Sequence, residues 1–303
     1  MDWFLQQLIN GLALGSIYAL IALGYTMVYG VLRFINFAHA DVLMLGAYAA
    51  YFLAPAVSSV LPLPSITGAL IVTLLAAIIC AGIGILIEFL AYRPLRARPK
   101  LTVLITAIGV SLFIEFTCQH KAVFGADTKP FPKLLPAADY NWGGLVVSSN
   151  DLVVVVVTAL LLAAMWFIVQ RTKMGTAMRA VSFNQQAAAL MGVNINRIIS
   201  FTFGLGSALA AIAGILYALK APGIEPLMGV QPGLRAFVAA VLGGIGNLPG
   251  AALGGLLLGL LETFAGGISG LSNYRDGIAF AILILILLFK PAGLLGKATV
   301  EKV

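Results

Sequence analysis

Long uncharged stretches are the feature of this sequence that most restricts its fold. Thirty consecutive residues between Asp2 and Arg33 carry no charge, and forty-six between Asp41 and Glu88 carry none. A bilayer core needs roughly 20 apolar residues per helical crossing, so the second stretch has to turn back and cross twice. The whole chain is 61% hydrophobic and 10% charged, whereas soluble domains are about 45–50% apolar and about 25% charged. The sequence therefore predicts an all-α, polytopic membrane protein in a lipid bilayer.

Eight apolar runs predict the membrane helices. Their approximate ranges are 5–30, 35–54, 66–91, 101–119, 152–170, 198–219, 236–261 and 277–289. Pro55, Pro62 and Pro64 mark the turn after the second run, because proline lacks the amide donor of a helix. The Gly-Asn-Leu-Pro-Gly cluster at 246–250 is turn-forming, so the number of helices is nine if both halves of the seventh run cross. We expect one transmembrane domain over residues 1–303.

Basic residues predict which loops face the cytoplasm. Eleven of the eighteen Lys and Arg residues lie in segments 93–100, 171–197 and 290–303, and Lys and Arg are retained on the cytoplasmic side. Segment 121–151 balances three Lys with three Asp, so we place it outside. This topology puts the N-terminus outside and the C-terminus inside, unless a short segment dips in and out. It also accounts for the net charge of +7 without nucleic-acid binding.

A weak internal repeat predicts two inverted halves. Residues 14–22 and 205–213 agree at six of nine positions, and the expected topology runs the two helices in opposite directions. Inverted repeats are typical of transporters. Helix 152–170 is then the linker, although a chance match in an Ala-, Leu- and Gly-rich chain is the alternative.

Polar residues at membrane depth are the candidates for a translocation path. They are Asn36, His39, Asp41 and Arg235, and such groups are costly in hydrocarbon unless they face protein or water. The structural alternative is that Asn36 caps a helix whose first turns hold His39 and Asp41. We expect Arg235, at the outer mouth of a broken helix, to meet a substrate carboxylate or a lipid phosphate.

Two further carboxylates, Glu88 and Glu115, lie near helix ends. Long polar side chains in such places commonly extend to the membrane interface. We therefore expect both to reach the polar boundary of the bilayer.

The segment 171–197 is the longest expected cytoplasmic loop, and long loops in compact folds usually carry function. Asn184 is a suitable N-cap, Gln185 to Met191 is Ala-rich and helical, and Gly192 can take the left-handed position that ends a helix. The apolar face of this helix holds Ala187, Ala188, Leu190 and Met191. We expect this apolar face to dock on a partner protein or, alternatively, to lie on the membrane surface.

Enzymatic motifs are missing from the sequence. It contains no GxxxxGK[ST] phosphate-binding loop, and its two histidines do not form an HExxH zinc motif. We expect neither ATP hydrolysis nor a cofactor or metal in this chain alone.

Four sequence strings resemble a known family. Gln186-Ala187-Ala188-x-x-x-Gly192 resembles the EAA-x-x-x-G coupling motif of ABC importer permeases, with Gln186 in place of Glu and without the I-x-L-P that often follows. The other strings are INFAHADVLMLGAYAAY (35–51), LGGIGNLPGA (242–251) and FKPAGLLGK (289–297). With these, the whole chain resembles the LivH-type permeases of branched-chain amino acid ABC importers.

The resemblance implies the partners and the residues that contact them. Such a permease pairs with a second, homologous permease, sits on two cytoplasmic ABC ATPase subunits in the bacterial inner membrane, and receives substrate from a periplasmic binding protein. The implied ATPase-coupling residues are Arg179, Asn184, Gln186, Ala187, Ala188, Leu190 and Gly192. ATP is used by the partner subunits.

The substrate implied is leucine, isoleucine or valine, and relatives in the wider family carry urea, amides or sugars. A secondary transporter and a passive channel are the alternatives from other classes. A proton-coupled carrier buries several titratable groups mid-helix, and these helix centres hold almost none, which favours the permease.

Overall fold

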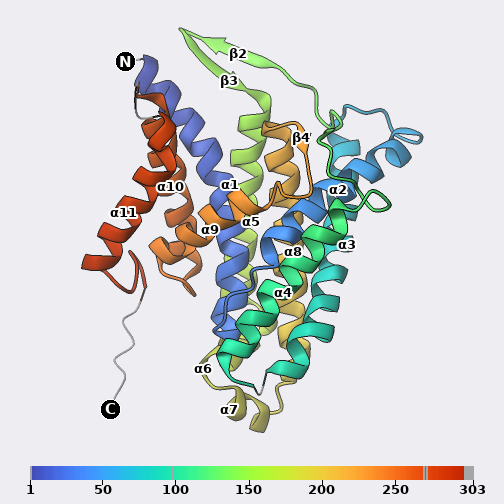
Figure 1. Ribbon diagram of the computed structural model, residues 1–303, viewed down its shortest axis with the longest axis vertical. Helices are drawn as coiled ribbons and strands as arrows, with labels where there is room; N and C mark the ends of the chain where they lie inside the picture. The colour runs from blue at the N-terminus through green and yellow to red at the C-terminus, as the bar shows by residue number, and fades with distance from the viewer. Residues whose placement is uncertain (1, 97, 269, 271, 297–303) are drawn as a thin grey trace.

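The computed structural model describes residues 2–96, 98–268, 270 and 272–296, which form a helical bundle with two small two-stranded sheets (Figure 1). Within these residues, seven helices are long and apolar enough to cross a membrane. They are α1 (Asp2–Leu32), α2 (His39–Ser58), α3 (Ile66–Ile87), α4 (Lys100–Gln119), α5 (Ser149–Arg171), α8 (Ile195–Lys220) and α10 (Leu248–Gly267). The prediction of an all-α polytopic membrane protein is confirmed.

Several boundaries differ from the expected ones. The run 236–261 divides into the short helix α9 (Val230–Gly243) and α10, and the last apolar run forms α11 (Arg275–Phe289). Pro55 was expected to mark a turn, yet α2 continues through it to Ser58 and the chain turns only afterwards. The end of α3 passes into a π-helical turn, Glu88–Tyr92, and then a 3-10 turn, Arg93–Leu95.

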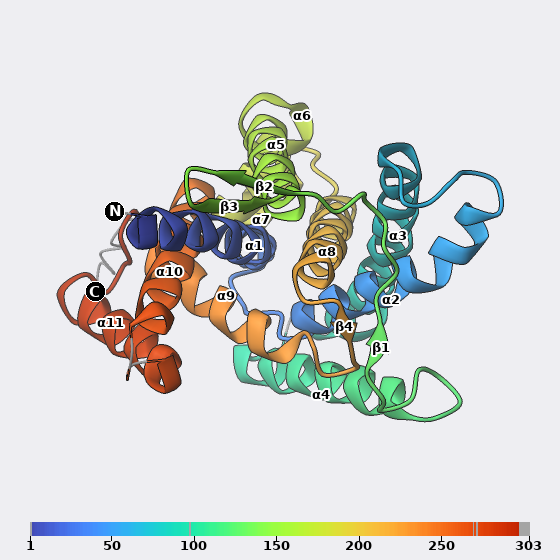
Figure 2. The same cartoon turned by 90° about the horizontal axis from the view of Figure 1, so that it is seen from above.

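The two central helices, α1 and α8, lie side by side and run in opposite directions (Figures 1 and 2). α1 packs along α10, where an added Cβ at Gly15 would lie 2.9 Å from the backbone of Leu256. α8 packs along α3, where Gly84 leaves room for the Ser207 side chain. Small residues let membrane helices approach closely. The two helices that carry the internal sequence repeat, α1 and α8, thus each pack along one further long helix, and the inverted repeat stays a prediction.

Two helices begin inside the bundle rather than at its ends. After α1, the link 33–38 turns back among the helices before α2 starts, and residues 221–229 return in the same way before α9 (Figure 1). The starts of α2 and α9 meet at Ala40. The contact is so close that a side chain at Gly229 or Gly233 would collide with that residue. Close packing therefore fixes the crossing of the two helices.

The lower end of the bundle in Figure 1 holds the turn that follows α3, residues 93–96, and two short helices, α6 (Lys173–Phe183) and α7 (Gln185–Leu190). The upper end holds the hairpin of β2 (Asp139–Trp142) with β3 (Leu145–Ser148). A second small sheet pairs β1 (Lys129–Pro130) with β4 (Gly223–Ile224). Two segments rich in basic residues thus share one end, and the charge-balanced segment lies at the other. Of the expected cytoplasmic tail 290–303, residues 297–303 lie outside the described part.

Candidate coupling and translocation sites

The coupling segment 171–197 contains two helices, where the sequence analysis expected only the second. Thr172 caps α6 by accepting a hydrogen bond from the Gly175 amide at 3.1 Å, and Asn184 caps α7 by accepting one from the Ala187 amide at 3.0 Å. Gly192 has a φ of +82°, the left-handed conformation that favours glycine at the end of a helix. The expected local geometry around α7 is therefore present.

The exposed part of the coupling segment is an apolar tip, formed by Phe183, Leu190 and Met191. Their side chains are 88%, 89% and 84% exposed. Phe183 was missed by the sequence analysis, since an apolar residue just before an N-cap commonly packs back on its own helix. Ala188 was expected on the exposed face but is only 4% exposed. It lies where α7 packs against α6 and α8, so the exposed face of α7 is the opposite one.

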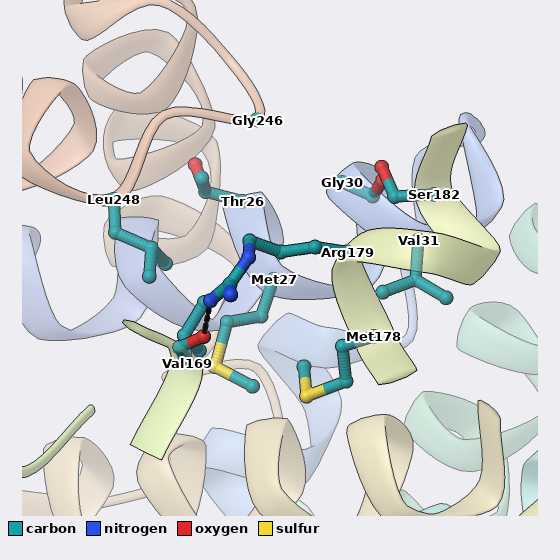
Figure 3. Close-up of a pocket in the computed structure, with 10 residues that line it drawn as sticks. All are labelled: Thr26, Met27, Gly30, Val31, Val169, Met178, Arg179, Ser182, Gly246 and Leu248. Atoms are coloured by element: carbon teal, nitrogen blue, oxygen red, sulfur yellow. Dashed lines mark hydrogen bonds between the residues drawn. The ribbon is translucent and has the colours of Figure 1, made fainter. Parts of the chain in front are cut away.

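Arg179 extends across a pocket at the lower end of α1, shown in Figure 3. Its guanidinium donates hydrogen bonds to the Val169 carbonyl and, at 3.4 Å, to the hydroxyl of Thr176. The pocket is lined by Thr26, Met27, Gly30, Val31, Val169, Met178, Arg179, Ser182, Gly246 and Leu248. Arg179 thus ties α6 to the end of α5 beside the turn between α9 and α10.

Asn36 does not cap α2, contrary to the structural alternative considered above. The N-cap position belongs to Ala38, whose side chain makes no capping hydrogen bond. The Asn36 side chain instead accepts a hydrogen bond of 2.6 Å from the Tyr92 hydroxyl. Asn36 therefore joins the link 33–38 to the π-helical turn after α3.

His39 and Asp41 lie in the first turn of α2, as expected, and each is only 1% exposed. The His39 ring packs 4.7 Å from the ring of Tyr25 and fits against Gly24, where a side chain would overlap it. Nε2 of His39 and Oδ2 of Asp41 have no hydrogen-bond partner in the described part of the protein. The beginning of α2 thus gathers polar atoms with unused hydrogen-bonding capacity.

Arg235 is paired with carboxylates of the protein itself. Its Nη1 lies 2.9 Å from Oε1 of Glu262 and donates to the Tyr18 hydroxyl at 3.0 Å, and its Nη2 lies 2.8 Å from Asp276. Tyr18 in turn donates to Glu262 at 2.8 Å. These carboxylates come from α10 and α11, far along the chain, so the sequence alone does not indicate them. Contact of Arg235 with a substrate carboxylate or a lipid phosphate stays a prediction. Among the described residues, Arg235 forms its hydrogen bonds and ion pairs with α1, α10 and α11 rather than with Asn36, His39 or Asp41.

Glu88 was expected at the membrane interface, but its side chain is fully buried. It pairs with Arg93 at 2.9 Å and with Arg96, and it accepts a hydrogen bond of 2.7 Å from Ser200 of α8. Two arginines and a hydroxyl thus replace the water that a buried carboxylate loses. Glu115 is half-buried on α4, which packs against α2, the helix that carries Asp41.

Comparisons with known proteins match almost the whole chain. A family model described as "Branched-chain amino acid transport system / permease component" matches residues 7–287. The high-affinity branched-chain amino acid transport system permease protein BraD of Pseudomonas aeruginosa is 44% identical over 99% of this chain and 98% of its own. LivH of Escherichia coli K12, which bears the same description, is 39% identical over the same shares.

A shorter match joins the chain to a sugar permease. The ribose import permease protein RbsC of Escherichia coli K12 is 32% identical over 41% of this chain and 40% of its own. No solved structure matches.

Proposed function

The chain belongs to the family of permease components of branched-chain amino acid transport systems, and we propose that it forms the membrane pathway of an ABC importer for leucine, isoleucine and valine. It is a multi-pass protein of the bacterial inner membrane. Since the sequence has no phosphate-binding loop, ATP hydrolysis falls to separate subunits. The match to the ribose permease supports a sugar substrate less strongly than the other matches support a branched-chain amino acid, because it spans under half of the chain.

The structural observation that carries this proposal is the apolar tip at the lower end of the bundle. Aromatic and Met side chains are enriched in protein interfaces, and this tip stands at the end that holds two of the basic segments. We assign Phe183, Leu190 and Met191 as the contacts with an ATPase subunit, with the exposed Gln186 and Ala187 beside them. Asn184 and Gly192 set the ends of α7, and Ala188 and Arg179 hold the segment on the bundle.

The complete importer contains a second homologous permease, two cytoplasmic ATPase subunits and a periplasmic binding protein. The ATPases bind at the lower end in Figure 1, and the hairpin at the upper end faces the binding protein. The C-terminus is cytoplasmic because the tail 290–303 is basic, and basic segments are retained on that side. Bound cofactors are not required in this chain.

The translocation path passes the beginning of α2, where Asn36, His39 and Asp41 lie together. Polar atoms without partners at Nε2 of His39 and Oδ2 of Asp41 support this assignment, since buried polar groups are normally satisfied. Discontinuous helices in transporters commonly begin near the substrate at the midplane. We assign Arg235 a structural role because internal carboxylates neutralise it.

Reconstitution tests the proposed function. We expect the purified permease pair with its ATPases in liposomes to accumulate radiolabelled leucine only when ATP and leucine-loaded binding protein are both present. A nonhydrolysable ATP analogue is the control for nucleotide binding alone. Leucine uptake driven by a proton gradient without ATP would show that the chain is a secondary transporter.

A further inference from the structure

The link 33–38 is attached to α6 on one side. The Ser182 hydroxyl donates a hydrogen bond to the carbonyl of Gly30, at the end of α1, and Arg33 donates one of 3.1 Å to the Ser182 carbonyl. Ser182 directly precedes Phe183, one of the three residues of the apolar tip. The start of the link is therefore bonded to the residue next to the surface that meets the ATPase.

The π-helical turn Glu88–Tyr92 is attached to the start of α8. Glu88 accepts the 2.7 Å hydrogen bond from Ser200, and Arg96 donates one of 2.7 Å to Asn196. α8 begins at Ile195, only a few residues after α7 ends. The turn is thus bonded to the helix that continues from the other end of the coupling segment.

Tyr92 connects this turn to the link. Its hydroxyl donates to Asn36 at 2.6 Å, and its ring lies 5.3 Å from that of Phe34 and 5.4 Å from that of Phe203 on α8. Tyr92 has no exposed surface. Because packed side chains cannot be displaced independently, a shift of α8 moves Tyr92 and, with it, the link.

The backbone at the start of the link is held in an uncommon conformation. Arg33 has a φ of +56°, which is uncommon for a residue with a side chain and is maintained only by its surroundings. π-helical turns within α-helices are frequent at functional sites. The positive φ of Arg33 and the π-helical turn that ends at Tyr92 are thus joined through the contacts of Tyr92 with the link.

We propose that Ser182 and Tyr92 are positioning residues that carry movement of the coupling segment to the link 33–38 and so shift the start of α2. Neither residue touches substrate. The inference rests on the proposed function, because it assigns a purpose to ATPase docking at the apolar tip. It adds the route by which ATPase movement reaches the buried polar cluster at Asn36, His39 and Asp41.

The test compares two tyrosine variants in the complete reconstituted importer. Tyr92→Phe removes the hydroxyl bonded to Asn36, and Tyr48→Phe removes one equally buried that has no hydrogen-bond partner in the described structure. We expect Tyr92→Phe to lower the leucine transported per ATP hydrolysed by about fivefold, the effect of one typical hydrogen bond. Its ATPase rate with loaded binding protein should persist. Tyr48→Phe should match the wild type in both measurements.

A serine pair tests the other attachment. Ser182→Ala should lower the same ratio, whereas Ser58→Ala, which removes a local hydrogen bond to Pro55 in α2, should not. A normal ratio in both Tyr92→Phe and Ser182→Ala would overturn the inference and leave the proposed function intact. Failure of the wild type to import leucine with ATP would instead reject the proposed function before any variant is compared.

Hydrogen exchange of the wild-type importer gives a readout that does not depend on a variant folding. ATP binding should change amide exchange in residues 33–38. Unchanged exchange there, with altered exchange in α6 and α7, would overturn the inference.

Discussion

Arg235 is held by side chains from three other helices, Tyr18 of α1, Glu262 of α10 and Asp276 of α11. We expect Arg235→Leu to lower the stability of the permease by up to about 3–5 kcal/mol, because buried Glu262 would lose its nearest cationic partner. Only Arg275, 3.8 Å from the Glu262 carboxylate, would remain to pair with it. Glu262 is only 3% exposed. The measurement is unfolding of the purified permease in detergent.

The matched control for Arg235→Leu is the double variant Arg235→Leu with Glu262→Leu. Replacing both members of a buried pair by apolar residues is often close to neutral, so the double variant should regain much of the lost stability. Equal destabilisation of the single and double variants would contradict the assignment of an ion pair and would point to lost packing.

Local sequence patterns predicted some of these residues correctly and failed for others. Asn184 and Gly192 could be assigned from sequence because a helix cap bonds to atoms two or three residues away. Asn36 and Arg235 could not, because their partners Tyr92 and Glu262 come from other helices. Glu88 has its two arginine partners, Arg93 and Arg96, nearby in the sequence. Its burial against Ser200 of α8, however, depends on tertiary packing. A sequence pattern shows that a polar group in the membrane needs a partner, but only the tertiary packing identifies it.

Among the elements, the apolar runs marked the helices well because membrane crossings are long and uniformly apolar. The 11-residue helix α6 was missed. It lacks a long apolar run, and its position depends on tertiary contacts such as those of Ser182 and Arg179. Ala188 was assigned to the wrong face for the same reason, since α7 has no fixed orientation until it packs on α6 and α8.

The corrected orientation of α7 changes what its substitutions should do. We expect Leu190→Asp to weaken ATPase copurification roughly tenfold, because docking would then bury an unpaired carboxylate in an apolar contact. Ala188→Trp should act differently and destabilise the permease by about 1–3 kcal/mol through overpacking.

The control for Leu190→Asp is Val60→Asp, in the turn between α2 and α3 at the other end of the bundle. Val60 is 82% exposed, so the same charge is added without touching the coupling segment. If both aspartate variants retain the ATPase, the apolar tip is not the docking surface, and α7 more closely fits a helix on the membrane surface.

On the scale of the whole molecule, one contact bears on the side of the N-terminus. The topology predicted from sequence depended on counting the membrane crossings back from segment 93–100. A segment that dips into the membrane without crossing it would change that count. The link 33–38 does turn back into the bundle. The Gln6 side chain, however, exchanges two hydrogen bonds of 2.9 Å with the backbone of Val146 in the hairpin. The start of α1 and the hairpin therefore lie on the same side, whatever the number of crossings between them.

Accessibility to a charged thiol reagent tests the orientation of the whole bundle. Single cysteines at Arg98 and Thr176, at the lower end, should react only when the reagent reaches the cytoplasm, and those at Asp2 and Asp139 should react from outside. The physical reason is the retention of basic segments on the cytoplasmic side. Cys80 and Cys118 are buried, so the parent protein serves as the unlabelled background. Labelling of Thr176 from outside would invert the topology and remove the coupling segment from the reach of any ATPase.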